Sequence, residues 1–184
     1  MLVLAHGVID SPVGPLAIEA TDMGLRSIAF HGARRDGAYG GDAPRFLSQT
    51  VEQLESYFEG SLRTFHLPLD LSELSPFRRA VLEVLAGVPY AELVSYGWLA
   101  REIPTAPRAV GQAVAVNPIP IVIPCHRVIA ADGSLGGFSS GLDIKRKLLA
   151  LEGHGALSGG WVGRRAPRPE RAIGAERDAF ALSS

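Results

Sequence analysis

Asn117-Pro118-Ile119-Pro120-Ile121-Val122-Ile123-Pro124-Cys125-His126-Arg127-Val128-Ile129 is the stretch around which the rest of the chain is organised. Proline has no backbone N–H to give to a sheet and is not tolerated inside a helix. The residue before each proline is pushed towards extended geometry. Residues 117–124 are therefore predicted to form a stiff, extended segment that delivers Cys125 to a fixed place.

Cys125 is the only cysteine among 184 residues. A lone cysteine is most often a small buried hydrophobic residue, and that interpretation stays open on the pattern alone. A cysteine acts as a nucleophile only as the thiolate, which needs a base or a cation close by. His126 and Arg127 follow Cys125 directly and offer both, so the pattern favours a functional thiol.

A glycine-rich loop, residues 131–141, follows this stretch, and residues 142–151 have the apolar spacing of a helix. Glu152 lies at the C-terminal end of that helix, directly before Gly153, the type of residue that ends helices. A carboxylate in this position opposes the helix dipole. We therefore expect Glu152 to have a partner elsewhere in the fold. The alternative is a solvated acid at a helix end.

Together these residues resemble the active-site signature of the O6-alkylguanine-DNA alkyltransferases, in which Pro124-Cys125-His126-Arg127-Val128 is preceded by Asn117 and followed by Glu152. The resemblance extends from about Pro76 to Gly153 and, more weakly, to residues 11–16 and 24–25. It implies DNA repair by direct, irreversible transfer of an alkyl group from O6 of guanine in duplex DNA to Cys125. Such a transfer uses each molecule once and needs no cofactor. Some relatives carry a structural zinc in the N-terminal domain, and this chain has no cysteines there to hold a metal.

The resemblance also implies a role for each catalytic residue. Cys125 attacks the carbon attached to O6, His126 acts as the base through a water molecule, and Glu152 holds the imidazole in the right tautomer. Asn117 braces the site by hydrogen bonding across the turn at Cys125. Neighbouring residues on a strand face opposite ways, so Cys125 and His126 need a turn between them in order to cooperate.

DNA contacts are implied for a second set of residues. Arg108 fills the gap that the flipped-out base leaves in the stack, and Tyr96 presses the phosphate on the 3′ side of that base. Arg127 braces the site or meets a phosphate. The helix that begins at Arg108 is rich in small residues and enters the minor groove, where it reads little base sequence. Its contact positions are Ala109, Gly111 and Ala115.

The loop after Cys125 resembles the wall of the base pocket, formed by Gly136, Gly137, Phe138 and Ser139. Some relatives have tyrosine in place of Phe138, and its hydroxyl donates a hydrogen bond to the departing guanine. Phe138 keeps the packing surface and lacks the hydroxyl.

The chain is predicted to have an α+β fold with an N-terminal domain at residues 1–74, a transfer domain at residues 75–155 and a flexible tail at residues 156–184. Period-two alternation and turn residues in the first domain predict a small antiparallel sheet. Its strands and helix are expected at residues 2–9, 15–21, 24–30 and 44–59, with a further strand at 65–69.

The second domain is expected to be mainly helical and winged-helix-like. Serine followed by proline at residues 75–76 starts a helix that ends at residue 86. Helices at residues 96–103 and 108–117, joined by a short turn, outline a helix-turn-helix. Helical hairpins pack cores more often than they bind DNA, so this outline is weak by itself. A short helix is also predicted at residues 172–182.

Composition restricts the remaining possibilities. One cysteine excludes an intrachain disulfide, and no segment has the length and hydropathy of a membrane span. We expect a cytoplasmic monomer without a membrane partner. The net charge of −1 divides into −5 over residues 1–75, +2 over residues 76–155 and +2 over residues 156–184, so a DNA-binding face must be a local patch in the second half.

Two other functions remain compatible with the sequence. A cysteine hydrolase would use Cys125 and His126 and release its covalent intermediate with water and an oxyanion hole. A DNA-binding module or alkyltransferase-like damage sensor would bind without reacting, although such sensors lack the cysteine. A stable thioether formed once per molecule separates the three.

Overall fold

The computed structural model describes residues 4–32, 41–103 and 105–154. These residues form two compact units, one that ends at Glu73 and one that begins at Leu74. The predicted tail, with its short helix at residues 172–182, lies outside the described residues.

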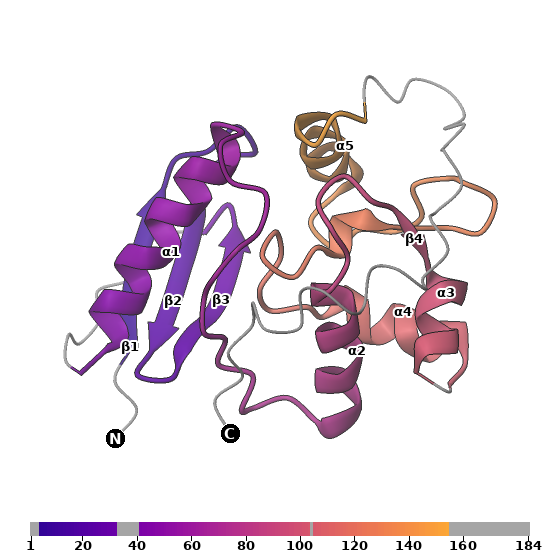
Figure 1. Ribbon diagram of the computed structural model, residues 1–184, viewed down its shortest axis with the longest axis horizontal. Helices are drawn as coiled ribbons and strands as arrows, with labels where there is room; N and C mark the ends of the chain where they lie inside the picture. The colour runs from indigo at the N-terminus through magenta and orange to yellow at the C-terminus, as the bar shows by residue number, and fades with distance from the viewer. Residues whose placement is uncertain (1–3, 33–40, 104, 155–184) are drawn as a thin grey trace. The chain divides into compact units, whose positions relative to one another are not determined.

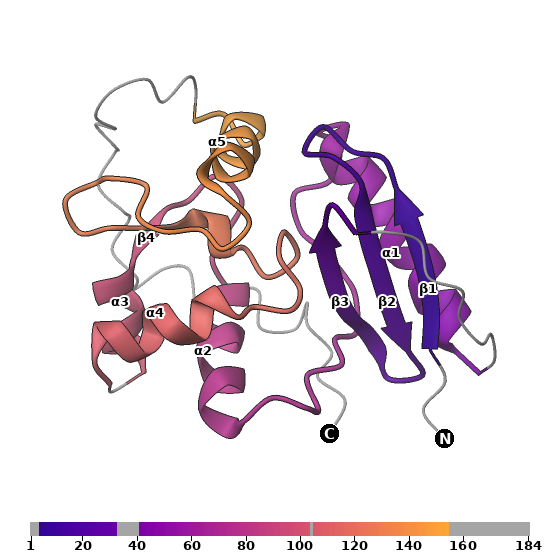
Figure 2. The same ribbon diagram turned by 180° about the vertical axis from the view of Figure 1, so that it is seen from behind.

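The first unit is an antiparallel three-stranded sheet with one helix on its face (Figure 1). Its elements are β1 (Leu4–Ile9), β2 (Leu16–Thr21), β3 (Gly24–Phe30) and α1 (Ala43–Phe58). Leu16, Ile18 and Ala20 alternate along β2 and are buried, as expected for a strand with one face on a core. Figure 2 shows the opposite side of this unit, where the strands lie in front of α1.

The start of α1 is capped by the sheet. The carboxylate of Asp22, in the turn between β2 and β3, accepts hydrogen bonds from Asp42 N at 2.9 Å and Ala43 N at 3.2 Å. These are amide groups that a helix leaves without partners at its first turn. The cap therefore fixes α1 on the sheet.

The expected strand at residues 65–69 is wrong. Only Leu69 forms an isolated bridge, to Leu25 of β3, with Leu25 N donating to Pro68 O and Asp70 N donating to Leu25 O. Pro68 has no N–H, so the segment cannot continue a ladder along β3.

A buried carboxylate closes the first unit. Asp70 accepts hydrogen bonds from Thr21 Oγ1 at 2.8 Å and from Ser72 Oγ at 2.6 Å. The Arg26 guanidinium lies 3.6 Å from Asp70 Oδ2 and also pairs with Glu73. This cluster, called the Asp70 cluster below, attaches the chain end of the unit to the sheet.

The second unit is mainly helical, and the predicted α+β fold is confirmed. Figures 1 and 2 show α2 (Pro76–Ala86), α3 (Tyr96–Glu102) and α4 (Pro107–Ala115) gathered at one end of this unit and α5 (Leu142–Leu151) at its other end. The remaining elements are β4 (Val94–Ser95), η1 (Cys125–Arg127) and β5 (Val128–Ile129), and β4 pairs with β5 in a short parallel ladder.

Serine caps start two of these helices. Ser75 accepts from Arg78 N before α2, and Ser95 accepts from Trp98 N at 3.1 Å before α3. α3 and α4 pack together, as in a helix-turn-helix. α4 begins and ends slightly earlier than predicted. None of the helices within the described ranges is long and apolar enough to cross a membrane.

The prediction of an extended segment at residues 117–124 is wrong. The chain folds back on itself: Ile123 N donates to Ile119 O at 2.9 Å, Pro120 and Ile123 form a bridge, and Ile121 has a φ of +77°. Proline fixes φ but leaves ψ free to turn. Residues 119–123 are all buried, and an extended strand at a surface would bury only one face of them.

Candidate functional site

Cys125 begins the 3-10 turn η1, in which Arg127 N donates to Pro124 O at 2.9 Å. A 3-10 helix turns by a third of a circle per residue, so consecutive side chains point in three different directions. The turn sends His126 and Arg127 towards α5, where both meet Glu152. All three residues of η1 are buried.

Glu152 lies at the centre of this site. His126 Nε2 is 2.9 Å from Oε1, and because a carboxylate only accepts, Nε2 carries the proton. Arg127 donates from Nε to Oε2 at 2.9 Å and from Nη2 to Oε1 at 2.8 Å, and Ala91 N donates to Oε2 at 3.1 Å. Glu152 is 4% exposed, so it is not a solvated helix-end acid. Burial alone would raise its pKa, but the bonds from His126 and then Arg127 hold the pKa well below its usual range.

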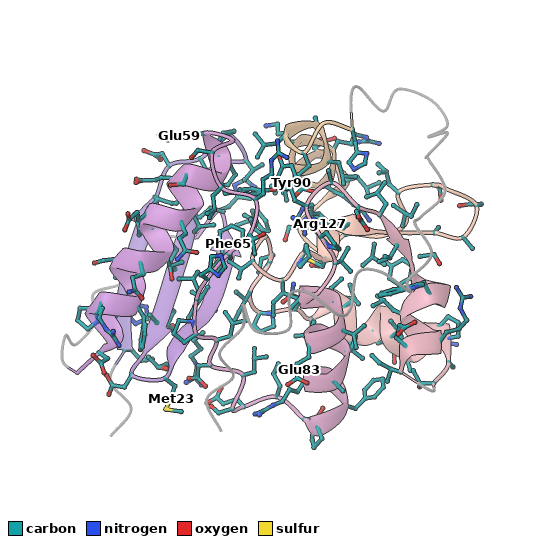
Figure 3. The ribbon with its side chains drawn as sticks, in the orientation of Figure 1. Met23, Glu59, Phe65, Glu83, Tyr90 and Arg127 are labelled. Carbon is teal, nitrogen blue, oxygen red and sulfur yellow. The ribbon has the colours of Figure 1, made fainter. Side chains whose placement is uncertain are left out.

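Arg127 is buried in this ion pair, which corrects its assignment to the DNA contacts. Its third donor, Nη1, reaches Val88 O at 2.5 Å. The guanidinium carbon lies 5.8 Å from the centre of the Tyr90 ring, and Figure 3 shows the two side chains together. With 5% of its surface exposed, Arg127 is better placed to hold Glu152 than to meet a phosphate.

His126 is fully buried and has one unused nitrogen. Within the described ranges, its Nδ1 is a buried polar atom without a hydrogen-bond partner. Burial lowers the pKa of His126, Glu152 opposes this, and the charges of Arg127 and Lys145 lower it further. These effects favour the neutral ring near pH 7, which leaves a lone pair on Nδ1 to take a proton.

Lys145 is a functional residue of the site that the sequence did not predict. It is fully buried on α5, and Nζ donates to Val128 O at 2.6 Å, to Leu135 O, and to Gly137 O at 3.4 Å. Burial lowers the pKa of Lys145 to about 8, and the charge of Cys125 opposes this. A lysine within the apolar stripe of the predicted helix was the signal that could have found it.

Two neighbours act against the cost of ionising Cys125. Burial raises the pKa of the thiol, whereas a hydrogen bond from the Asn117 side chain and the positive charge of Lys145 lower it. Asn117 also donates from Nδ2 to Ile123 O at 2.8 Å and accepts from Ile119 N at 3.0 Å. It therefore fastens both the folded segment before Cys125 and the thiol itself.

The predicted pocket loop, residues 136–139, contacts residues of α3 and α5. Tyr96 Oη donates to Gly137 O at 3.4 Å, and a Cβ at Gly136 would lie 3.3 Å from the Tyr96 ring. Gly136 has a φ of +66°, which glycine adopts without strain. Phe138 lies with its ring centre 6.0 Å from Lys145 Nζ, and Ser139 is exposed. Burial, followed by the charge of Cys125, raises the pKa of Tyr96.

The outer face of α4 is a separate surface. Arg108 and Ala115 are exposed, and Ala109 and Gly111 are partly exposed. The opposite face, formed by Val110, Ala113 and Val114, packs into the unit. The predicted DNA-binding residues of α4 thus share one face of small side chains and do not take part in the buried site. In the described part of the chain, no group of three His, Cys, Asp or Glu side chains is placed to hold a metal ion.

Comparisons with known proteins cover both units. Sequence models of 6-O-methylguanine DNA methyltransferase match this chain, its DNA-binding domain at residues 76–154 and its ribonuclease-like domain at residues 4–71. The chain is 43% identical to the methylated-DNA–protein-cysteine methyltransferase of Mycolicibacterium paratuberculosis, over 81% of this chain and 92% of that protein.

Solved structures agree with these matches. The crystal structure of Mycobacterium tuberculosis O6-methylguanine methyltransferase has a TM-score of 0.70 at 38% identity, and the match covers 81% of this chain and 92% of that chain. The M. tuberculosis OGT crystallised in complex with DNA has a TM-score of 0.70 at 40% identity, with 79% and 90% covered.

Proposed function

The chain belongs to the 6-O-methylguanine DNA methyltransferase family, and from this membership we infer that Cys125 accepts the alkyl group from O6 of guanine in double-stranded DNA. Like the relatives named methylated-DNA–protein-cysteine methyltransferase, it repairs DNA by moving an alkyl group to its own cysteine. One observation carries the assignment: the only cysteine of the chain stands directly before a buried histidine whose Nδ1 is unused.

The transfer is a single displacement. The thiol proton passes to His126 Nδ1 through a water molecule, and the thiolate sulfur then bonds to the alkyl carbon while the C–O6 bond breaks. The electron pair of the broken bond leaves with guanine, which takes up a proton from water, and His126 returns its proton to water. The product is a thioether without a good leaving path, so each molecule reacts once.

Lys145 and Asn117 favour the thiolate. A buried thiol resists ionisation because its charge loses contact with water. The Lys145 ammonium supplies an opposite charge, and the Asn117 amide supplies a hydrogen bond to the thiol. Lys145 also ties residues 128, 135 and 137 together, which places the pocket loop relative to Cys125.

The DNA is bound by the outer face of α4. A base inside a duplex cannot reach a thiol that is 7% exposed, so the damaged nucleotide must be rotated out of the stack. The small side chains of Ala109, Gly111 and Ala115 suit a close approach to the minor groove, and Arg108 fills the space that the base leaves. Tyr96 meets the phosphate beside that base. Phe138 contributes packing without the hydroxyl that tyrosine would offer.

One experiment separates this proposal from its rivals. Purified protein is mixed with a duplex that contains one O6-methylguanine, and the intact chain and its peptides are weighed. We expect one methyl group per chain, on Cys125, and light scattering should find a monomer before and after. Methyl release beyond one equivalent would indicate a hydrolase, and binding without modification would indicate a sensor.

The rotation of the base is tested separately. Arg108→Ala should lower repair of the duplex much more than reaction with free O6-benzylguanine, because only the duplex requires extrusion. Arg146→Ala, which removes an exposed arginine from α5, is the matched control. Equal losses on both substrates would remove Arg108 from this role.

A further inference from the structure

Two basic side chains share one buried carboxylate in this site. His126 and Arg127 both bond to Glu152 Oε1, at 2.9 Å and 2.8 Å, and Arg127 bonds to Oε2 as well. We propose that Arg127 is a positioning residue for the transfer reaction: it neutralises Glu152, so that His126 rests as a neutral base with its proton on Nε2. This inference rests on the proposed role of His126 towards Cys125.

Glu152 alone would favour a charged His126. A buried carboxylate beside a histidine favours the charged imidazolium, because the pair gains the attraction of opposite charges. A histidine that already carries both protons cannot accept one from a thiol. The guanidinium of Arg127 does not lose its proton, so it supplies a permanent countercharge. Glu152 is thereby satisfied before His126 is protonated.

The other charged groups around His126 act in the same direction. Glu152 is the acid in contact with the ring, from the end of α5. Arg127 on η1 and Lys145 on α5 are positive, and Cys125 on η1 is neutral as the thiol. Protonating His126 at this stage would place three cations around one anion. Once the thiol has lost its proton, the Cys125 thiolate adds a second negative charge to that of Glu152. This second charge stabilises the imidazolium of His126.

The geometry of Arg127 suits such a role. Its Nε and Nη2 form a fork on the two oxygens of Glu152, which fixes the plane of the carboxylate. Its Nη1 is anchored to Val88 O, and the Tyr90 ring lies beside it. Among the described residues its side chain bonds to Glu152 and Val88 and not to Cys125, so it acts through Glu152 and His126 and is not itself a catalytic residue.

The proposal is tested first on the wild-type protein by ¹⁵N NMR of the histidine rings, with His126→Gln used to assign the signals. At pH 7 we expect a neutral His126 ring with its proton on Nε2. Replacing Arg127 by Gln keeps amide donors and removes the charge. It should raise the midpoint of the His126 titration by about 1–3 pH units. The pH below which the single-turnover rate with free O6-benzylguanine falls should rise by a similar amount.

Three controls sharpen the result. Arg127→Lys keeps the charge and should keep the wild-type midpoint, although a single ammonium cannot form the fork. Arg146→Gln removes an exposed arginine from α5 and should change neither titration nor rate. The Arg127→Gln, Glu152→Gln double variant has no carboxylate to attract a proton, so its midpoint should return to the wild-type value or below it.

The proposal is overturned if wild-type His126 is an imidazolium at pH 7, a measurement that needs no variant to fold. It is also overturned if folded Arg127→Gln titrates like the wild type. The NMR readout does not depend on alkyl transfer. A failure of the proposed function would appear as unmodified Cys125 with His126 still neutral, which is a different result.

Discussion

Asp70 and Glu152 are buried carboxylates, one in each unit, and each lies beside an arginine. Asp70 accepts from the hydroxyls of Thr21 and Ser72, with the Arg26 guanidinium at 3.6 Å. Glu152 accepts from a histidine, a forked arginine and a backbone amide. In both places, hydrogen bonds outweigh burial and lower the pKa of the acid.

The two carboxylates differ in whether a hydrogen-bond partner has a second group that can take up a proton. The hydrogen-bond partners of Asp70 are two hydroxyl groups and the backbone amide of Ser72, which do not titrate in this range, and the bonds attach the segment after the sheet to β2. The histidine on Glu152 has a second nitrogen, Nδ1, with no hydrogen-bond partner in the described residues. A buried acid therefore stabilises the fold when its partners have no further chemistry, and it supports a reaction when one partner can still take a proton.

The largest effect on activity is expected when Cys125, the alkyl acceptor, is removed. Cys125→Ala should transfer no alkyl group at all, because the chain has no other cysteine. The variant should still bind duplex DNA, since the exposed face of α4 is unchanged. Mass spectrometry of the protein and a binding titration with the O6-methylguanine duplex check this. Methyl transfer to any other residue would contradict the assignment.

A smaller loss of activity is expected when the charge of Glu152 is removed. Glu152→Gln makes His126 a weaker base, because the carboxylate no longer raises the pKa of the ring. We expect the single-turnover rate at pH 7 to fall about tenfold or more, a cost of about 1.4 kcal/mol in the barrier. The loss should shrink as the pH approaches the ordinary thiol pKa of about 8.5. Rates measured from pH 6 to 9 decide this, and a variant equal to wild type throughout would exclude the role.

The matching change at Asp70 should affect the stability of the protein and not the transfer rate. Asp70→Asn should leave the transfer rate unchanged and lower the free energy of unfolding by about 1–3 kcal/mol, because it disturbs buried hydrogen bonds. The pKa of Asp70 is lowered in the folded state, so its contribution is present above about pH 4 and is lost as the pH falls. Urea unfolding of both proteins at pH 7 and pH 3 should show the difference shrinking in acid. An undiminished difference at pH 3 would assign the effect to packing.

The smallest effect is expected at the edge of the Asp70 cluster. The Glu73 side chain is 76% exposed where it pairs with Arg26. Exposed ion pairs contribute less than about 1 kcal/mol, and salt screens them. Glu73→Gln should therefore change the unfolding midpoint little, and less still at high salt. A loss as large as that of Asp70→Asn would show that the two acids act as one unit.

The sequence was most informative where local chemistry decides the structure. Period-two alternation predicted the strands, Ser75 and Ser95 predicted helix starts, and the dipole argument indicated that Glu152 needs a partner. Long-range packing decided the rest. Prolines did not reveal that residues 117–124 would turn, because burial of the isoleucines depends on the whole unit. The roles of Lys145 and Arg127 depend on carbonyl and carboxylate oxygens that only the folded chain brings together.

The turn before Cys125 has a consequence for biosynthesis. Ile121 has a φ of +77°, a conformation that costs a branched residue about 1–3 kcal/mol and persists only when its surroundings enforce it. Asn117 and Lys145, which favour the thiolate, reach Cys125 only after this turn has closed and α5 has docked. A chain still emerging from the ribosome therefore carries a thiol without the base, the cation and the amide that the folded site places around it. The acceptor becomes reactive only once this unit has folded, which protects a group that can be used once from being spent before the protein can meet DNA.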